Sequence, residues 1–182
     1  MPPFRKLTER EIFRGHLITV ASARFGAPDG DEFDRDIVHH PGAVSVVPVV
    51  DGTHAVMVRQ YRAAIEGELL EIPAGKRDVE GEAPERTAHR ELVEEIGMRA
   101  GRMEKLAEFY NSPGFTDEHS FVFLGLDLEE VGQPDPQGPE EQVMTIERVA
   151  LADVPDLVAR GELVDGKSII GLLLARERLG VR

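Results

Sequence analysis

Cysteine is absent from this chain of 182 residues, and so is any long hydrophobic segment. Without cysteine there can be no disulfide, no cysteine-bound zinc or iron–sulfur cluster and no thiol nucleophile, and a location in the cytoplasm is favoured. The longest apolar stretches, residues 43–50 and 169–175, are much shorter than the roughly 20 residues of a membrane-spanning helix. The N-terminal segment mixes acidic and basic side chains, unlike a signal peptide. We therefore expect a cytoplasmic protein with no membrane partner.

Positive charge is also in short supply. There are 21 lysines and arginines against 34 aspartates and glutamates, so the formal net charge is −13. This surplus of carboxylates repels a phosphate backbone, which argues against a nucleic-acid partner. Where carboxylates gather in one place, a cation is usually needed to hold them together.

The hydrophobic pattern predicts strands first, with helices between and after them, which is the order of an α+β protein. The expected strands cover residues 12–25 and 33–38, as a hairpin around a turn at 26–30, and then 43–50, 54–60, 69–72, 104–110, 120–126 and 143–150. The expected helices cover 84–96, 151–160 and 167–179. Asp51-Gly52 is a strong signal for a hairpin turn, and Pro84 and Gly97 suit the two ends of the first helix.

Three glutamates share one face of the helix expected over 84–96. Glu91 lies three residues before Glu94 and four before Glu95, a spacing that brings Cβ atoms to within about 5–6 Å of one another. Arg90 can pair with Glu94, which leaves the other two carboxylates without a counter-charge. Hard carboxylate oxygens suit Mg²⁺ or Mn²⁺, so this face is a candidate metal site. An ordinary solvated acidic face is the alternative.

The surroundings of this helix favour the metal site. The run from Gly75 to Met98 resembles the signature of the Nudix hydrolases: a glycine, a spacer, Glu82, seven residues, and then Arg-Glu-Leu-Val-Glu-Glu-Ile-Gly-Met from Arg90 onward. The spacer has six residues, one more than the family pattern, and the additional residue falls in the turn ahead of the helix.

This resemblance implies a Nudix fold, in which a mixed β-sheet is sandwiched between helices. It also implies an enzyme that cleaves nucleoside diphosphates linked to another moiety, with two or more divalent ions, Mg²⁺ or Mn²⁺. The metal ligands that it implies are Glu91 and Glu95, with the carbonyl of Ala74 as an additional ligand. Glu94 would be a supporting or water-mediated ligand and could also act in catalysis. Arg90 would form a salt-bridged pair with Glu82 beside them. Metal ions suit this chemistry, because pyrophosphate hydrolysis needs neutralised phosphate oxygens and in-line attack by water.

Three segments outside the signature look like the ADP-ribose pyrophosphatase branch of the family: 58–62, 70–75 and 111–118. By this resemblance Arg62 would bind the diphosphate, because a guanidinium fork matches phosphate oxygens, although a solvated charge is the alternative. The other substrate contacts implied are Glu71, Phe115 and Phe33, of which Phe33 could equally be a core residue.

The implied reaction converts ADP-ribose to AMP and ribose 5-phosphate. One alternative is a GDP-mannose or other nucleotide-sugar diphosphatase. A second is a ligand-sensing Nudix regulator, although such sensors usually carry an added basic DNA-binding segment that we do not expect here.

In this branch a glutamate on a loop before a late strand activates the attacking water. Glu140 and Glu141 follow the Pro- and Gly-rich loop at 132–139 and precede the strand expected at 143–150. Glu141 matches better by its distance to Met144. Two solvated loop acids are the alternative, and a mobile loop would let the site close before chemistry.

Two parts of the chain are expected to have different roles. Residues 1–40 are predicted to form an N-terminal β extension, and residues 41–182 the Nudix hydrolase domain. A hairpin is marginally stable alone, so its apolar side chains need a covering surface. Members of the branch exchange N-terminal strands in a dimer, so we expect a homodimer in which this extension exchanges or contacts substrate.

Overall fold

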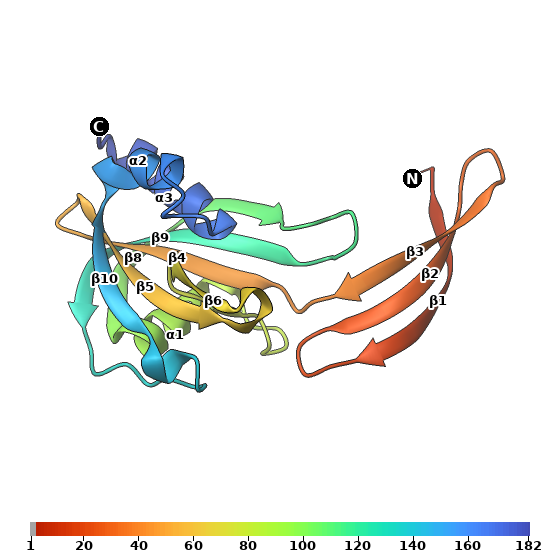
Figure 1. Cartoon of the computed structure of the whole chain (residues 1–182), viewed down its shortest axis with the longest axis horizontal. Coiled ribbons are helices and arrows are strands. Elements are labelled where there is room, and N and C mark those ends of the chain that lie inside the picture. Colours follow the sequence, from red (N-terminus) through yellow and green to blue (C-terminus); the bar gives the residue numbers. More distant parts are fainter. Residues whose placement is uncertain (1–2) are drawn as a thin grey trace. The chain divides into compact units, whose positions relative to one another are not determined.

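The computed structural model describes residues 3–182 (Figure 1). The chain forms two compact units. The first contains the chain up to Gly42 together with Phe109–Ser120, and the second contains Ala43–Glu108 and Phe121–Arg182. Within the described range, no helix combines the length and the hydropathy needed to span a bilayer.

The first unit contains an antiparallel sheet in the order β1-β2-β3. Its strands are β1 (Arg5–Arg14), β2 (Thr19–Gly26) and β3 (Glu32–His39). The expectation of one strand over 12–25 is therefore wrong, and the extension is more than a hairpin. A tight turn divides this stretch, with the N–H of Gly15 donating to the carbonyl of Ile18 at 2.9 Å. The expected turn at 26–30 is confirmed, with Gly30 at φ +96°.

The loop at 111–118 is attached to the end of β3 within this unit. The N–H of Val38 donates to the carbonyl of Phe115 at 2.7 Å, and the N–H of Asp117 donates to the carbonyl of Val38 at 3.2 Å. The imidazole of His39 lies between two carboxylates, 2.5 Å from Asp117 and 3.0 Å from Glu9. His39 therefore connects β1, β3 and the loop.

We expect His39 to stabilise the protein more at low pH than at high pH. Its hydrogen bond to Asp117, and then that to Glu9, raises its pKa above the usual value. Stability from a raised pKa is fully present below the unfolded-state pKa and is lost as the pH rises through the folded-state pKa. His39→Gln should thus lower the free energy of unfolding by up to about 1 kcal/mol at about pH 5, and by less at about pH 9. Urea unfolding at both pH values measures this, and equal losses would contradict it.

The second unit is built on a seven-stranded sheet, counted within the described residues, with the path β10-β5-β4-β9-β8. In addition, β6 pairs with β5 and β7 pairs with β4. The strands are β4 (Ala43–Val50), β5 (His54–Arg62), β6 (Gly67–Glu71), β7 (Ala74–Lys76), β8 (Met98–Tyr110), β9 (His119–Glu130) and β10 (Thr145–Ala150). The helices are α1 (Pro84–Ile96), α2 (Val154–Ala159) and α3 (Gly166–Leu179), with 3₁₀ turns at Ala63–Ile65, Glu141–Val143 and Leu151–Asp153.

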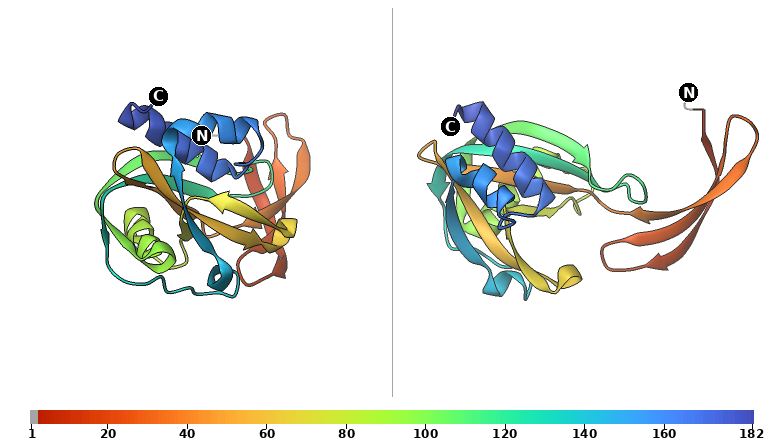
Figure 2. Two further views of the ribbon diagram at one scale, coloured as in Figure 1. Left: turned by 60° about the vertical axis from the view of Figure 1, so that its left-hand side comes forward. Right: turned by 45° about the horizontal axis from the view of Figure 1, so that its top comes forward.

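Strand β4 is buried on both faces, as its nearly continuous apolar sequence predicts. Val44 and Val46 belong to a core cluster with the apolar stripe of α1. Val47 faces the other way, where a Cβ added at Gly171 of α3 would lie only 2.9 Å from its side chain. The sheet is therefore covered by α1 on one face and by α2 and α3 on the other (Figure 2). This confirms the α+β class and the sheet between helices.

Candidate active site

Helix α1 carries the three glutamates, and it buries two of them. Glu91 is 8% exposed and Glu95 is 5% exposed, whereas the side chain of Glu94 is 25% exposed. The helix begins at Pro84 and ends at Ile96 as the sequence predicted, and the carboxylates of Glu91 and Glu95 lie against Gly75 and Ala74 of β7.

The three carboxylates have different partners. Nη1 of Arg90 lies 2.9 Å from Glu91 and 3.0 Å from Glu94. Its Nη2 lies 3.8 Å from Glu82, so Arg90 stands among acidic groups as the resemblance implied. Glu95 accepts a hydrogen bond at 3.0 Å from the backbone N–H of Ala74. The close contacts of these three carboxylates are thus with one guanidinium and one backbone N–H.

Negative charge is undercompensated at this face. Burial raises the pKa of Glu91 to about 7; Arg90 opposes this shift, and the charges of Glu94 and Glu141 add to it. Burial likewise raises the pKa of Glu95 to about 8. The hydrogen bond from Ala74 opposes this rise, whereas the charges of Glu91 and Glu141 add to it. A bound cation would relieve both the burial penalty and the mutual repulsion.

These residues fit a divalent metal ion by their chemistry. The donors are hard oxygens, the ligand type that Mg²⁺ and Mn²⁺ prefer. In the described part of the chain, no three acidic or histidine side chains already converge as a closed metal cage. Arg90 instead occupies Glu91 and Glu94, so metal ligation would require their carboxylates to turn from the guanidinium.

Gly75 in β7 makes room for the Glu91 carboxylate. A Cβ added at Gly75 would lie 1.8 Å from Cδ of Glu91, so any side chain there must displace the carboxylate. We expect Gly75→Ala to weaken Mg²⁺ affinity by on the order of 10- to 100-fold, the effect typical of disturbing a ligand's support. The measurement is a Mg²⁺ titration of activity and of melting temperature.

Gly67→Ala in β6 is the matched control for this variant. Its added Cβ would meet the carbonyl oxygen of Ile65 at 3.7 Å, an ordinary contact. Equal Mg²⁺ affinities in Gly75→Ala and Gly67→Ala would show that Gly75 does not position Glu91.

The loop that carries Glu141 is fastened to the end of α1. The N–H of Val131 donates to the carbonyl of Gly97 at 2.9 Å, and the N–H of Asp135 donates to that of Glu94 at 2.8 Å. Glu141 accepts at 2.6 Å from the N–H of Gln137. Glu141, Glu94 and Glu95 line one cavity of about 220 Å³, together with Pro134, Pro136, Gln142, Met144 and Ile146. Of the two loop glutamates, Glu140 is exposed and Glu141 is half-buried.

Arg62 and Glu71 form a two-pronged ion pair at the ends of β5 and β6. Nε and Nη2 of Arg62 donate to the two carboxylate oxygens at 2.7 and 2.6 Å. The carboxyl side chain of Glu71 is 1% exposed, whereas that of Arg62 is 36% exposed. Arg62 is therefore the member of the pair that can meet a ligand, and Glu71 holds it.

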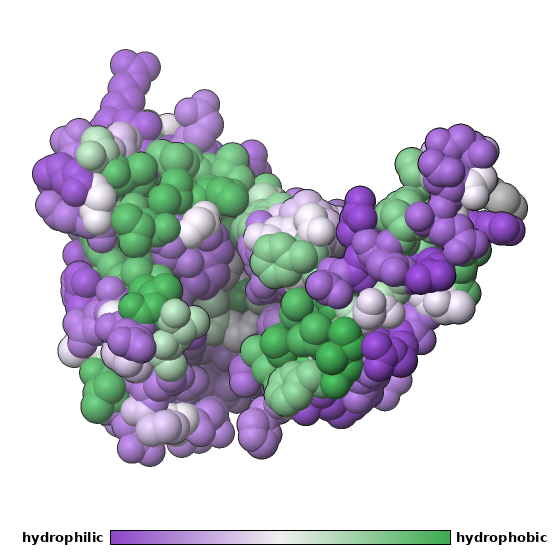
Figure 3. Space-filling model, turned by 45° about the vertical axis from the view of Figure 1, so that its right-hand side comes forward, coloured by the Kyte–Doolittle hydropathy of each residue, from purple (hydrophilic) through white to green (hydrophobic). Residues whose placement is uncertain are grey.

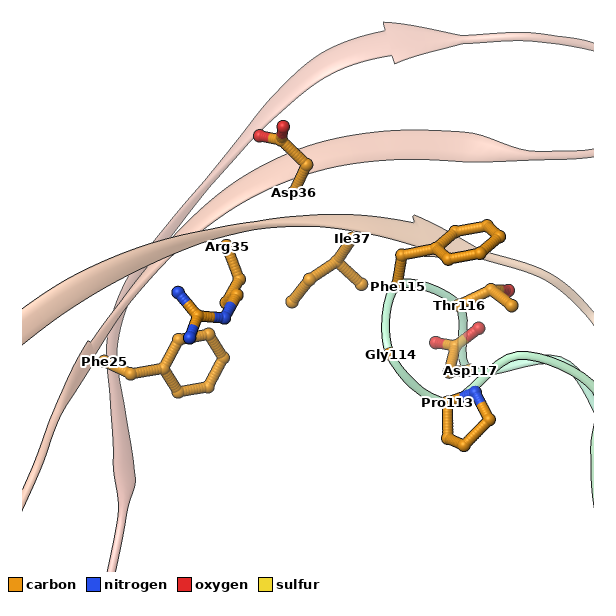
Figure 4. Close-up of a pocket in the computed structure, with 9 residues that line it drawn as sticks. All are labelled: Phe25, Arg35, Asp36, Ile37, Pro113, Gly114, Phe115, Thr116 and Asp117. Atoms are coloured by element: carbon orange, nitrogen blue, oxygen red, sulfur yellow. The ribbon is translucent and has the colours of Figure 1, made fainter.

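The two aromatic residues singled out in the sequence lie in the first unit. Phe33 stacks on Phe25 with ring centroids 5.7 Å apart, and the guanidinium of Arg35 lies 4.5 Å from its ring. Phe115 is 57% exposed. It lines a pocket of about 320 Å³ with Phe25, Arg35, Asp36, Ile37 and the loop from Pro113 to Asp117 (Figure 4). Both other groups of predicted residues, around α1 and around Arg62, belong to the second unit.

Sequence reasoning missed Lys167. Its Nζ contacts the carboxylate of Glu71 and lies 2.9 Å from Asp165. A signal for it existed, because a lysine in the first turn of a helix faces the positive end of the helix dipole and needs an anionic partner.

Comparison with known proteins places these features in a family. The model of the NUDIX domain matches residues 39–169. An ADP-ribose pyrophosphatase from Bacillus subtilis is 39% identical over 164 residues, covering 90% of this chain and 88% of that protein. An ADP-ribose pyrophosphatase from Mycobacterium tuberculosis is 36% identical over 170 residues, covering 93% and 82%. A crystal structure of an ADP compounds hydrolase superposes with a TM-score of 0.83 at 25% identity, covering 99% of this chain and 96% of that one. The chain belongs to the NUDIX domain family.

Proposed function

We propose that this protein hydrolyses the pyrophosphate bond of ADP-ribose to give AMP and ribose 5-phosphate, with Mg²⁺ as the cofactor. The observation that carries the proposal is the buried, undercompensated carboxylate pair of Glu91 and Glu95 beside the cavity that Glu141 lines. The similarity to two ADP-ribose pyrophosphatases over most of the chain supports this choice of substrate.

Each group has a role in this proposal. Divalent ions, two or more, would neutralise the phosphate oxygens and lower the pKa of a bound water. Glu91 and Glu95 would hold the ions, with Glu94 as a supporting or water-mediated ligand and the Ala74 carbonyl as an additional donor. Glu141 orients the attacking water and accepts its proton. As the water oxygen bonds to phosphorus, the bond from phosphorus to the bridging oxygen breaks, and the bridging oxygen leaves with the second phosphate.

The pocket of the first unit suits a nucleobase. It offers the rings of Phe25 and Phe115 together with the guanidinium of Arg35, whereas Asp36 points to the other side of its strand (Figure 4). Aromatic faces and a guanidinium plane bind a planar base by stacking. We propose Phe115 as a base contact. Phe33 is a weaker candidate, because Phe25 and Arg35 already pack against its ring.

A substrate panel tests this function. ADP-ribose, GDP-mannose, NADH, diadenosine polyphosphates and 8-oxo-dGTP are compared with Mg²⁺, and with Mn²⁺ in parallel, by phosphate release after a phosphatase step. We expect ADP-ribose to give the highest kcat/KM. A preference for GDP-mannose would move the proposal to the nucleotide-sugar alternative. Tight binding of ADP-ribose without turnover would support a ligand-sensing role instead.

We also propose a homodimer that uses the N-terminal extension. Hydrophobic side chains are exposed on the first unit, among them Ile12 at 53%, Phe13 at 57% and Leu17 at 42%. Figure 3 shows such hydrophobic patches on an otherwise mostly hydrophilic surface. A second copy of the chain would cover them. Sedimentation that shows a fully active monomer at micromolar concentration would reject this. The cytoplasmic location stays a prediction from the absence of cysteine.

A further inference from the structure

The buried carboxylate of Glu71 has two cationic partners. Arg62 already engages both of its oxygens through a complete fork. Lys167 of α3, which lies 96 residues after Glu71 in the chain, adds a second cation at Oε2 of Glu71. One guanidinium fork satisfies a carboxylate in both charge and geometry, so the second cation needs its own explanation.

Lys167 occupies an electrostatically unfavourable place for the helix. It is the second residue of α3, where the backbone N–H groups create partial positive charge and a cation is disfavoured. Asp165 caps this end by accepting from the N–H of Ser168 at 3.0 Å, and it also lies 2.9 Å from Nζ of Lys167. Helix formation therefore does not explain the lysine, whereas the contact with Glu71 does.

The docking of α3 does not depend on Lys167 alone. The hydroxyl of Ser168 accepts a hydrogen bond at 2.8 Å from the N–H of Ile72, which follows Glu71 directly. Leu172 and Ala175 of the same helix are fully buried. Because these contacts remain when the lysine is replaced, the effect of its charge can be separated from the effect of folding.

Arg62 connects this network to the candidate active site. The positive charge of Arg62 acts against the burial-driven rise in the pKa of Glu95, and the charge of Glu95 in turn contributes to the raised pKa of Arg62. Nη1 of Arg62 takes no part in the fork to Glu71, so its two N–H groups can donate elsewhere. Without Lys167, Arg62 would be the cation that faces the carboxylates of both Glu71 and Asp165, and the net negative charge of that group would oppose binding of a diphosphate.

We propose that Lys167 is a positioning residue for diphosphate binding: by sharing the carboxylates of Glu71 and Asp165, it lets Glu71 hold Arg62 in place while the charge that Arg62 presents to the substrate is less fully cancelled. This proposal rests on the proposed function in one respect, the assignment of Arg62 to a nucleoside diphosphate. It requires that Lys167 act on the ligand through Arg62 and not by direct contact.

A double-mutant cycle tests this coupling with inorganic pyrophosphate as the probe. The wild type, Lys167→Met, Arg62→Met and the double variant are titrated by calorimetry with Mg²⁺ present. We expect Lys167→Met to weaken pyrophosphate binding on the order of tenfold in the wild-type background, and by less than about twofold in the Arg62→Met background. Equal losses in both backgrounds, no loss in either, or a wild type that does not bind pyrophosphate would overturn the proposal.

Two further variants separate positioning from structure. Lys105→Met removes an exposed lysine, 54% exposed at its side chain, and should leave pyrophosphate affinity unchanged. Lys167→Arg keeps the charge and should recover most of the affinity. A lower melting temperature in Lys167→Met with unchanged affinity would show a structural role only and overturn the proposal. If Lys167→Met does not fold, Lys167→Gln replaces it in the cycle.

Turnover provides the second readout. Lys167→Met should raise the KM for ADP-ribose on the order of tenfold and change kcat by less than about threefold, because the lost interaction serves binding. If the wild type does not hydrolyse ADP-ribose but the pyrophosphate cycle shows coupling, the proposed substrate is wrong and the role of Lys167 stands. If the wild type hydrolyses ADP-ribose but the pyrophosphate cycle shows no coupling, the proposed substrate stands and the role of Lys167 is wrong.

Discussion

Turnover by the Glu95→Gln variant is expected to fall by at least about 100-fold, since the loss of a metal ligand removes several kcal/mol of transition-state stabilisation. The same change should leave the metal-free protein at least as stable as the wild type. The amide oxygen can still accept from the N–H of Ala74, and the variant no longer buries a charge beside Glu91 and Glu141. Activity at saturating ADP-ribose and thermal unfolding in a chelator measure the two effects.

Magnesium binding gives this prediction a further readout. Mg²⁺ should raise the melting temperature of the wild type by mass action, because a ligand that binds the folded state alone stabilises it. The rise should be much smaller in Glu95→Gln. Glu80→Gln is the matched control, since Glu80 is exposed in the turn ahead of α1. A Glu95→Gln variant that keeps wild-type turnover and the full Mg²⁺ response would remove Glu95 from the metal site.

The expected loss of turnover and the expected retention of stability in Glu95→Gln have one cause: the carboxylates that would bind the metal are unfavourable for the metal-free fold. Burial and mutual repulsion make Glu91 and Glu95 unfavourable for the fold, and both have raised pKa values as a result. A cation would convert the same arrangement into a binding site, because burial strengthens its attraction to the carboxylates. Sites of this kind are kept for function at the expense of stability.

Local signals were sufficient to predict helix α1 and its glutamates. Pro84 at the first turn and the left-handed Gly97 after the last residue fix both ends of this helix. The spacing of Glu91, Glu94 and Glu95 then follows from helical geometry. The Asp51-Gly52 turn was also predictable from a local signal, because Asp-Gly is typical of tight turns in which both residues adopt positive φ, as they do here.

Features that depend on distant contacts were not predictable in this way. The three-residue strand β7 is too short to show a pattern and exists by pairing with β4. The contact of Lys167 with Glu71 joins parts of the chain that no local rule connects. The division of 12–25 into β1 and β2 was missed because its turn, Gly15–Ile18, lacks the usual Asn-Gly or Asp-Gly signal.

The Glu141→Gln variant is expected to lose about 10²- to 10⁴-fold in kcat, the usual contribution of a general base, with little change in KM. Two observations support the proposed role of Glu141. Its charge influences Glu91 and Glu95, and it lines the cavity that Glu94 and Glu95 share. Steady-state kinetics with ADP-ribose across a range of Mg²⁺ concentrations measures the effect.

Glu140→Gln is the matched control, because Glu140 is the preceding residue on the same loop and is exposed. It should change kcat by less than about tenfold, well below a general-base effect. A Glu141→Gln variant that high Mg²⁺ rescues would make Glu141 a metal ligand, because added metal offsets weaker binding but cannot replace a base. If neither variant loses more than about tenfold, this loop carries neither role. The base would then be sought at Glu94, which lines the same cavity and is partly exposed.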